Sequence, residues 1–237
     1  MNRWIVPAVA LAGAAIGGAA VLGYDRVIAP GGAERAQIET VVHDYVLAHP
    51  EIIPEAMRRL QDRENGSIVA ANRAAIVDPF GSAWAGNPRG DVTVVEYFDY
   101  NCGYCRAALP VIDQLLKDDP GVRIVYRDFP ILAPSSRDAA RASLAAAQQG
   151  KYRAFHDALY AAGPVSTATI VAAAARTGVD TAHVDDAAID AELAKNMEIA
   201  QKLGLNGTPS WVVGDRILSG AMPLDEIKRA IATARAG

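Results

Sequence analysis

The chain has few residues of the kinds that bind metals or form disulfides, since its 237 residues include two cysteines and four histidines. A structural zinc site needs four ligands, and these histidines show no pairing at ligand spacing. One chain therefore does not supply such a site alone, and only a site shared by two chains stays open. A basic excess is also lacking, because 23 Lys and Arg residues stand against 27 Asp and Glu residues. This balance gives no basic surface for nucleic acid.

Charge is absent from residues 4–23, which are mostly Ala, Val, Ile, Leu and Gly and follow Arg3. Such a run is typical of a secretory signal peptide or of a membrane anchor, and we assign residues 1–24 to one of these two. Either one exports the rest of the chain. We therefore expect the protein in the periplasm or another extracytoplasmic space, anchored to the inner membrane by residues 4–23 in the second case.

The two cysteines form one motif, Cys102-Gly103-Tyr104-Cys105, so the only intramolecular disulfide available joins Cys102 to Cys105. Structural disulfides are common in exported proteins. A loop this short, however, stabilises a fold less than a long one in the chain-entropy model. The pair is better explained as redox-active than as a structural crosslink.

The cysteine motif stands where a strand is followed by a helix. Residues 92–98 are rich in β-branched and aromatic side chains, which favours a buried strand, and residues 106–117 have apolar side chains at helical spacing. Free N–H groups at the start of the helix favour a thiolate at Cys102, which makes it a nucleophile. We expect Cys102 to be the exposed, attacking thiol and Cys105, one turn later, to be the buried, resolving thiol.

Glu96 interrupts the apolar strand with a carboxylate. By alternation it shares a face with Val94 and Phe98, and a buried carboxylate is costly unless it is paired or protonated. We expect it to lie beneath the cysteines and to exchange a proton with Cys105. The alternative is a solvent-facing position at a sheet edge.

Two amphipathic helices are predicted before the catalytic part, within residues 34–77, and the second either breaks at Asn65-Gly66 or continues beyond it. Their apolar stripes either pack on the chain's own domain or pair with copies from other chains. The stripe residues are Ile38, Val41, Val42, Tyr45 and Val46 in the first helix and Ile53, Met57 and Leu60 in the second.

A linker rich in turn-forming residues follows at 78–90, and further elements are predicted after the cysteine helix. They are a strand at 122–127, helices over about 136–203, a hairpin at 210–218 and a helix at 224–234. Just before the hairpin stand Gly207, Thr208 and Pro209. Pro209 is either an ordinary turn residue or a cis proline that places the Thr208 backbone beside the sulfurs, where it pairs with an extended substrate.

Together these motifs resemble the exported DsbA-like thioredoxin family. The resemblance spans roughly residues 86–237 and implies an α/β thioredoxin fold with a helical insertion at about 133–203, preceded by the N-terminal helical segment. It implies Cys102 and Cys105 as attacking and resolving thiols, and Glu96 as a buried acid. It also implies that Pro209 is a cis proline preceded by Thr208.

The differences between this sequence and that of the oxidase DsbA favour disulfide isomerisation as the activity. DsbA has Pro-His between its cysteines and Val before the cis proline, whereas this chain has Gly103-Tyr104 and Thr208, as the isomerase DsbC does. Without a histidine between the cysteines, the reduced form should be less favoured than in DsbA, so the protein should be less oxidising. Residues 38–60 are similar to the N-terminal helices of ScsC-type relatives, which implies a homo-oligomer, either dimer or trimer.

The leading interpretation is thus a protein thiol–disulfide oxidoreductase without a cofactor, acting on unfolded or misfolded exported proteins. A membrane reductase would serve an isomerase as redox partner, and a quinone-linked membrane oxidase would serve the alternative, a DsbA-like oxidase. A second alternative is a copper-tolerance module, because soft thiolates suit Cu(I). A third is a membrane-tethered holdase that binds unfolded clients with its helical arms.

Overall fold

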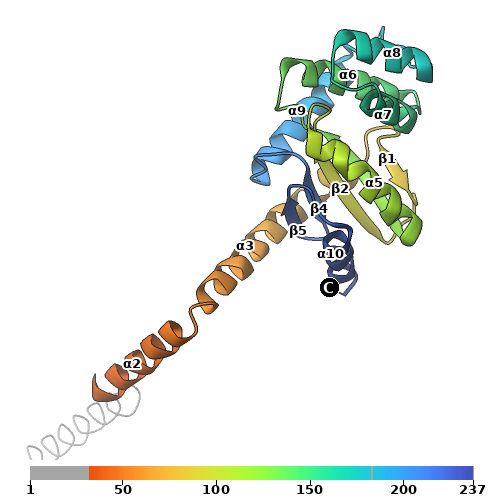
Figure 1. The fold of residues 1–237 in the computed structure, drawn as a ribbon. Coiled ribbons are helices and arrows are strands. Elements are labelled where there is room, and N and C mark those ends of the chain that lie inside the picture. Colours follow the sequence, from red (N-terminus) through yellow and green to blue (C-terminus); the bar gives the residue numbers. More distant parts are fainter. Residues whose placement is uncertain (1–31, 183, 237) are drawn as a thin grey trace, which may run out of the picture. The chain divides into compact units, whose positions relative to one another are not determined.

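The structure, a computed structural model, describes residues 32–182 and 184–236 (Figure 1). The predicted signal peptide or anchor at residues 1–24 lies outside the described residues. Within the described part of the chain, no helix combines the length and the apolar character needed to cross a membrane. The chain divides into two compact units, the first ending at Arg59 and the second beginning at Leu60.

The first unit is helical and exposes its apolar side chains. It contains α2 (Gly32–Ala48) and the start of α3 (Ile52–Ala71). The break between them falls at His49-Pro50, because a residue before proline is disfavoured in the α region. Seven large apolar side chains are each at least 50% exposed on the single chain. They are Ile38, Val41, Val42, Tyr45, Leu47, Ile53 and Met57.

The end of α3 behaves differently, because it packs on the sheet of the second unit. α3 continues through Asn65-Gly66, and Val69 near its end is fully buried. Ile76 in the short helix α4 (Arg73–Val77) is fully buried in the same apolar cluster. Residues 60–77 therefore lie with the catalytic unit, whereas the sequence pattern grouped them with the N-terminal helices.

A five-stranded mixed sheet forms the centre of the second unit, in the order β1-β3-β2-β4-β5. The strands are β1 (Trp84–Gly86), β2 (Val92–Phe98), β3 (Val122–Asp128), β4 (Ser210–Val213) and β5 (Arg216–Ser219). β2 and β3 are parallel, and the other neighbours are antiparallel. β1 falls in the predicted linker, so the sequence prediction missed it. Its three residues carry too little pattern to be recognised as a strand.

Helices cover both faces of the sheet (Figure 1). α5 (Gly103–Asp118) and α10 (Leu224–Ala236) pack on one face, and α4 and α9 (Ala187–Lys202) pack on the other. Between β3 and β4 the chain inserts α6 (Pro134–Gln148), α7 (Tyr152–Ala161), α8 (Thr167–Thr177) and α9. The predicted α/β class, with a large helical insertion and helices at the start, is confirmed.

Candidate active site

Cys102 occupies the N-cap position of α5, in an extended backbone conformation (φ −81°, ψ 116°). Its Sγ accepts a hydrogen bond from the Cys105 N–H at 3.3 Å, as a capping side chain does. As a thiol it also donates to the Thr208 carbonyl oxygen, 3.2 Å away. The sulfur is therefore held between the start of α5 and the loop that precedes β4.

Both cysteines are buried as free thiols, so the expectation of an exposed Cys102 is wrong. Its side chain is 5% exposed and that of Cys105 is 1% exposed, because the hydrogen bond to Thr208 holds the Cys102 sulfur against the protein. The space around the motif is nevertheless open. Tyr104 is 69% exposed, and a Cβ added at Gly103 would meet no heavy atom within 4 Å.

Glu96 is 2% exposed, in β2, which leads into the cysteine turn. Burial, with a smaller contribution from negative charge at Cys102, raises the pKa of its carboxyl to about 8. Burial raises the pKa of Cys105 strongly, and the Glu96 charge adds to this effect. The solvent-facing alternative for Glu96 is excluded. A carboxyl that titrates near neutral pH beside a buried thiol is suited to accept and return its proton.

The Thr208–Pro209 peptide bond is cis. β4 starts at the next residue and pairs with β2 in the register Glu96 to Trp211 and Tyr97 to Ser210. This pairing sets the Thr208 carbonyl beside Cys102. The structure thus brings Glu96, the two cysteines, Thr208 and Pro209 together at the carboxyl end of β2.

Sequence reasoning gave no role to Asp99, which the structure places at the centre of the cysteine turn. Its buried carboxylate accepts hydrogen bonds from the Asn101 N–H at 2.8 Å and from the Ile131 and Leu132 N–H groups at 2.9 Å each. The sequence Asp-Tyr-Asn after a strand is typical of an ordinary turn. Of the three hydrogen bonds, only the one from the Asn101 N–H joins neighbours in the sequence. The other two come from the loop after β3, a contact that local pattern does not reveal.

A cluster of aromatic side chains packs beside this turn and joins β2 and β3 to the helical insertion. Its members are Phe98, Tyr100, Tyr126, Tyr152, His156 and Tyr160. The Tyr100 hydroxyl donates to Ser143 Oγ at 2.9 Å and lies 3.0 Å from His156 Nδ1. Burial lowers the pKa of His156 to about 3, so its imidazole is neutral at pH 7. The insertion is therefore fixed to the strand that carries Glu96.

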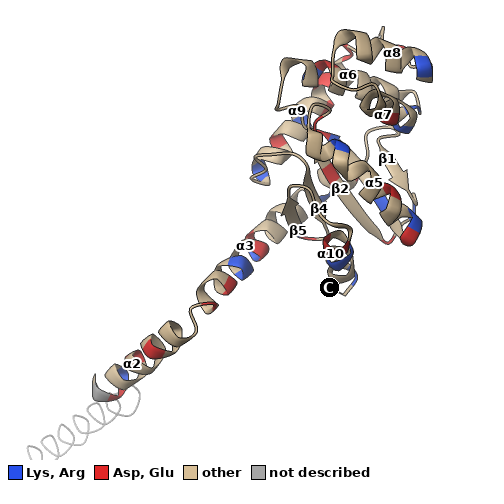
Figure 2. Ribbon diagram, viewed as in Figure 1, with Lys and Arg blue, Asp and Glu red and all other residues tan. Residues whose placement is uncertain are grey.

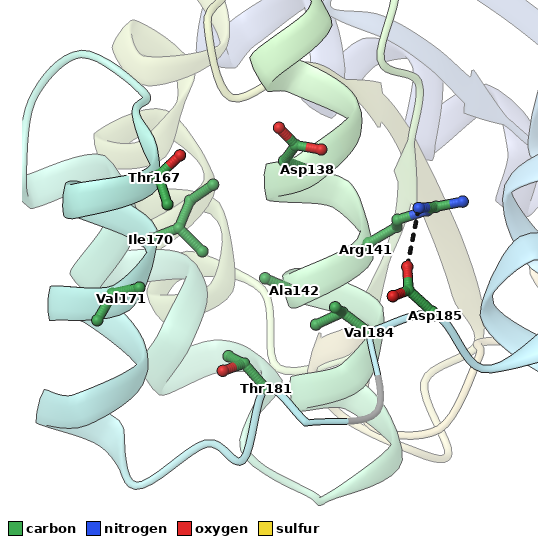
Figure 3. Close-up of a pocket in the computed structure, with 9 residues that line it drawn as sticks. All are labelled: Asp138, Arg141, Ala142, Thr167, Ile170, Val171, Thr181, Val184 and Asp185. Atoms are coloured by element: carbon green, nitrogen blue, oxygen red, sulfur yellow. Dashed lines mark hydrogen bonds and ion pairs between the residues drawn. The ribbon is translucent and has the colours of Figure 1, made fainter.

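Two other features of the described residues bear on ligand binding. No three His, Cys, Asp or Glu side chains within residues 32–182 and 184–236 form a group able to hold a metal ion. A hollow of about 260 Å³ lies in the insertion, between α6 and α8, where Arg141 forms an ion pair with Asp185 at 3.0 Å (Figure 3). Its lining includes no residue of the cysteine turn.

Comparison with protein-family models gives two matches in different parts of the chain. The DSBA-like thioredoxin domain matches residues 93–232. The copper resistance protein ScsC N-terminal domain matches residues 34–65.

Solved structures agree with this assignment of the fold. A thioredoxin-like oxidoreductase from Silicibacter pomeroyi is 45% identical, with a TM-score of 0.66, and the match covers 70% of this chain and 99% of that one. A linker-deletion mutant of ScsC from Proteus mirabilis is 26% identical, with a TM-score of 0.70, covering 88% and 98%. The fold is therefore of the predicted thioredoxin type.

Curated relatives contain a similar sequence as one part of a much longer protein. The Na(+)/H(+) antiporter NhaA 1 of Salinispora arenicola is 32% identical over 168 residues, which cover 68% of this chain. The chain spans about a quarter of the length of this relative, 26%.

Proposed function

Because the chain belongs to the family of DSBA-like thioredoxin domains, we propose that it is an exported thiol–disulfide oxidoreductase that favours disulfide isomerisation. Its substrates are unfolded or misfolded exported proteins. The observation that carries the proposal is the placement of Cys102 at the start of α5, with Cys105, Glu96 and the Thr208 carbonyl around it. The uncharged run at residues 4–23 supports export to the periplasm, by a signal peptide or with an inner-membrane anchor.

The reaction begins with attack of the Cys102 thiolate on a client disulfide. A bond forms between Cys102 Sγ and one client sulfur, and the other client sulfur leaves as a thiolate. In isomerisation the freed client thiolate attacks another disulfide of the client, and a further client thiolate then attacks the client sulfur bonded to Cys102. This last step forms a new client disulfide and releases Cys102 as a thiolate, with no net oxidation. Alternatively Cys105 attacks Cys102 Sγ, which leaves the client reduced and the protein with a Cys102–Cys105 disulfide.

Glu96 acts in the second of these routes, in which Cys105 attacks Cys102 Sγ. Cys105 must lose its proton before it attacks, and burial together with the Glu96 charge opposes a free thiolate there. The Glu96 carboxylate accepts this proton, and its pKa of about 8 lets it both take and return a proton near neutral pH.

Client binding uses the surface around the motif. Cys102 already donates to the Thr208 carbonyl, and no heavy atom lies within 4 Å of a Cβ added at Gly207, so the backbone beside Pro209 is open to an extended peptide. Two exposed apolar side chains belong to the motif and to the loop bonded to Asp99, with Tyr104 69% and Leu132 52% exposed. Unfolded clients expose apolar segments that suit such a surface.

The preference for isomerisation rests on Gly103-Tyr104 and Thr208, and on the proposal that the first unit, residues 34–59 of the predicted 34–77 segment, assembles two or three chains. Assembly holds a misfolded client near more than one Cys102 and so raises its effective concentration. Isomerisation also requires reduced Cys102, which a membrane reductase would maintain. A quinone-linked oxidase would instead keep the pair as a disulfide and give a DsbA-like oxidase.

A copper-tolerance function is the second candidate, because the family matched at residues 34–65 carries copper resistance in its name. In this case the two thiolates would hold Cu(I). Copper titration of the reduced protein, with Cys102→Ser as control, separates this function from thiol exchange.

The test of the proposed function combines two measurements. The redox state of Cys102 and Cys105 in growing cells, read by thiol alkylation, should be mainly reduced. The purified reduced protein should restore activity to a substrate with scrambled disulfides, and Thr208→Val should shift the balance toward net oxidation. A mainly oxidised pair with no unscrambling activity would establish the oxidase instead.

A further inference from the structure

Asp99 is a buried carboxylate whose bonds all lie within the protein. Asp99 is 2% exposed and lies in the turn between β2 and α5. One oxygen accepts the Asn101 N–H, and the other accepts the N–H groups of both Ile131 and Leu132. Charge-assisted bonds of this kind are stronger than neutral ones, and they offset the cost of burying the charge.

The backbone of the same residue touches both cysteines. Its carbonyl oxygen accepts the Cys102 N–H at 2.9 Å and the Tyr160 hydroxyl at 3.2 Å. Burial and the Glu96 charge raise the pKa of Cys105, whereas a hydrogen bond to the Asp99 backbone lowers it. A shift of this one peptide unit would therefore move Cys102 and weaken the support of the Cys105 thiolate.

The side chain anchors that backbone to a segment far away in the sequence. Ile131 and Leu132 belong to residues 129–133, between β3 and α6, and are 37% and 52% exposed. Asn101 strengthens the same connection, since its amide donates to the hydroxyls of Ser135 and Ser136 at the start of α6. The cysteine turn is thus fixed from one side by the loop after β3.

We propose that Asp99 is a positioning residue that holds the cysteine turn in its reactive geometry by binding residues 129–133. The proposal rests on the proposed role of Cys102 as attacking thiol. Asp99 itself touches no substrate, and its effect passes through the backbone that it fixes.

Asp99→Asn tests the carboxylate with almost no change in volume. An asparagine has one acceptor oxygen, so either the bond from Asn101 or the two bonds from the 129–133 loop must be lost. The NH₂ group of the asparagine then faces a backbone N–H. Two donors cannot form a hydrogen bond with each other. The turn should shift in response.

Asp128→Asn is the matched control. Asp128 lies opposite Phe98 in the β2–β3 register, is 1% exposed, and its nearest side-chain partner is Ser143 at 3.5 Å. Burial raises the pKa of its carboxyl, which favours the neutral form that an asparagine resembles. This variant changes a carboxyl of the same depth that makes no direct bond to the cysteine turn, since it reaches Tyr100 only through the Ser143 hydroxyl.

The measurement is the reaction of the reduced protein with oxidised glutathione, quenched with acid and read by mass spectrometry. Asp99→Asn should react about 10- to 100-fold more slowly per folded molecule, the effect of a small misplacement of a reacting group. Its glutathione equilibrium should move toward the disulfide form, because a displaced Cys102 loses the support of the N–H groups at the start of α5 in the reduced form. Amide hydrogen exchange at Ile131 and Leu132 should quicken. Asp128→Asn should match the wild type in all three measurements.

Equal rate and equilibrium constants for folded Asp99→Asn and wild type would overturn the proposal, even if the variant is less stable. If Asp99→Asn does not fold, Tyr160→Phe removes the hydroxyl that binds the same carbonyl and should still slow the reaction. An unchanged rate in that variant would overturn the proposal as well. Failure of the wild type to react with glutathione would instead remove the proposed function.

Discussion

At the scale of single residues, Glu96 links the chemistry of the site to the stability of the protein. Burial, with a smaller effect of charge at Cys102, raises the pKa of its carboxyl from 4.5 to about 8. The folded protein therefore keeps a proton that the unfolded chain releases above pH 4.5. The contribution of this retained proton to the free energy of unfolding is fully present below pH 4.5. It falls by about 1.4 kcal/mol per pH unit as the pH rises to about 8.

The prediction for Glu96→Gln follows from this titration. The glutamine stays neutral, so the free energy of unfolding of the variant relative to wild type should grow between pH 5 and 8 and level off above pH 8. Urea unfolding across this range measures it. A difference that does not change with pH would contradict a carboxyl protonated in the folded state.

The residues of the site differ in how far sequence could reveal them. Glu96, the cysteines and Pro209 stand out as a charge in an apolar strand, as the whole cysteine content and as a proline before a strand. Asp99 did not stand out, because two of its three partners lie more than 30 residues away. The burial of Cys102 was also missed, since it depends on the distant Thr208 carbonyl.

At the scale of elements, a buried ion pair connects β3 to the last helix of the insertion. Arg127 Nη1 lies 2.5 Å from Glu192 Oε1, and the two side chains are 1% and 5% exposed. The same guanidinium donates to the Ile76 carbonyl at the end of α4. One charged group thus joins α4, β3 and α9 beneath the sheet.

Glu192→Ala should destabilise the protein by about 3–5 kcal/mol, because it leaves the buried Arg127 charge without the Glu192 carboxylate that pairs with it. The control is Glu198→Ala, in the same helix, which breaks an exposed pair with Lys202 and should cost less than about 1 kcal/mol. Chemical denaturation at pH 7 measures both. Equal losses of unfolding free energy in the two variants would show that the buried ion pair contributes no more to stability than the exposed one.

Elements with strong local patterns were predictable and weakly patterned ones were not. β2 and β3 were expected close to their observed bounds from their β-branched runs, and the α5 pattern predicted a helix there. β1 has only Trp-Ala-Gly, and its place in the sheet depends on pairing with β3. The change in role along α3, from exposed to packed on the sheet, also depends on tertiary contact.

At the scale of the whole molecule, assembly is the proposal with the largest consequence for function. The first unit exposes seven large apolar side chains, an arrangement prone to aggregation if nothing covers them. Acidic and basic residues alternate along α3 instead of separating by sign (Figure 2). Apolar contact between copies of α2 and the start of α3 therefore best explains how these side chains are covered.

Deletion of residues 1–59 should give a monomer, because it removes the exposed apolar side chains and leaves the second unit intact. Light scattering should show residues 32–237 as a dimer or trimer and residues 60–237 as a monomer. The shorter protein should lose most of its activity on a scrambled substrate and keep its reaction with glutathione. Two monomers of equal unscrambling activity would show that the first unit is a spacer.

The proposed function depends on Cys102 attacking client disulfides and Cys105 resolving the mixed disulfides that form. The most direct test is to express Cys105→Ala in cells and to look for client mixed disulfides on non-reducing gels. We expect adducts that are cleaved by reductant and that are absent when Cys102 is also replaced by alanine. Adducts formed by Cys102→Ala through Cys105, with none from Cys105→Ala, would contradict it.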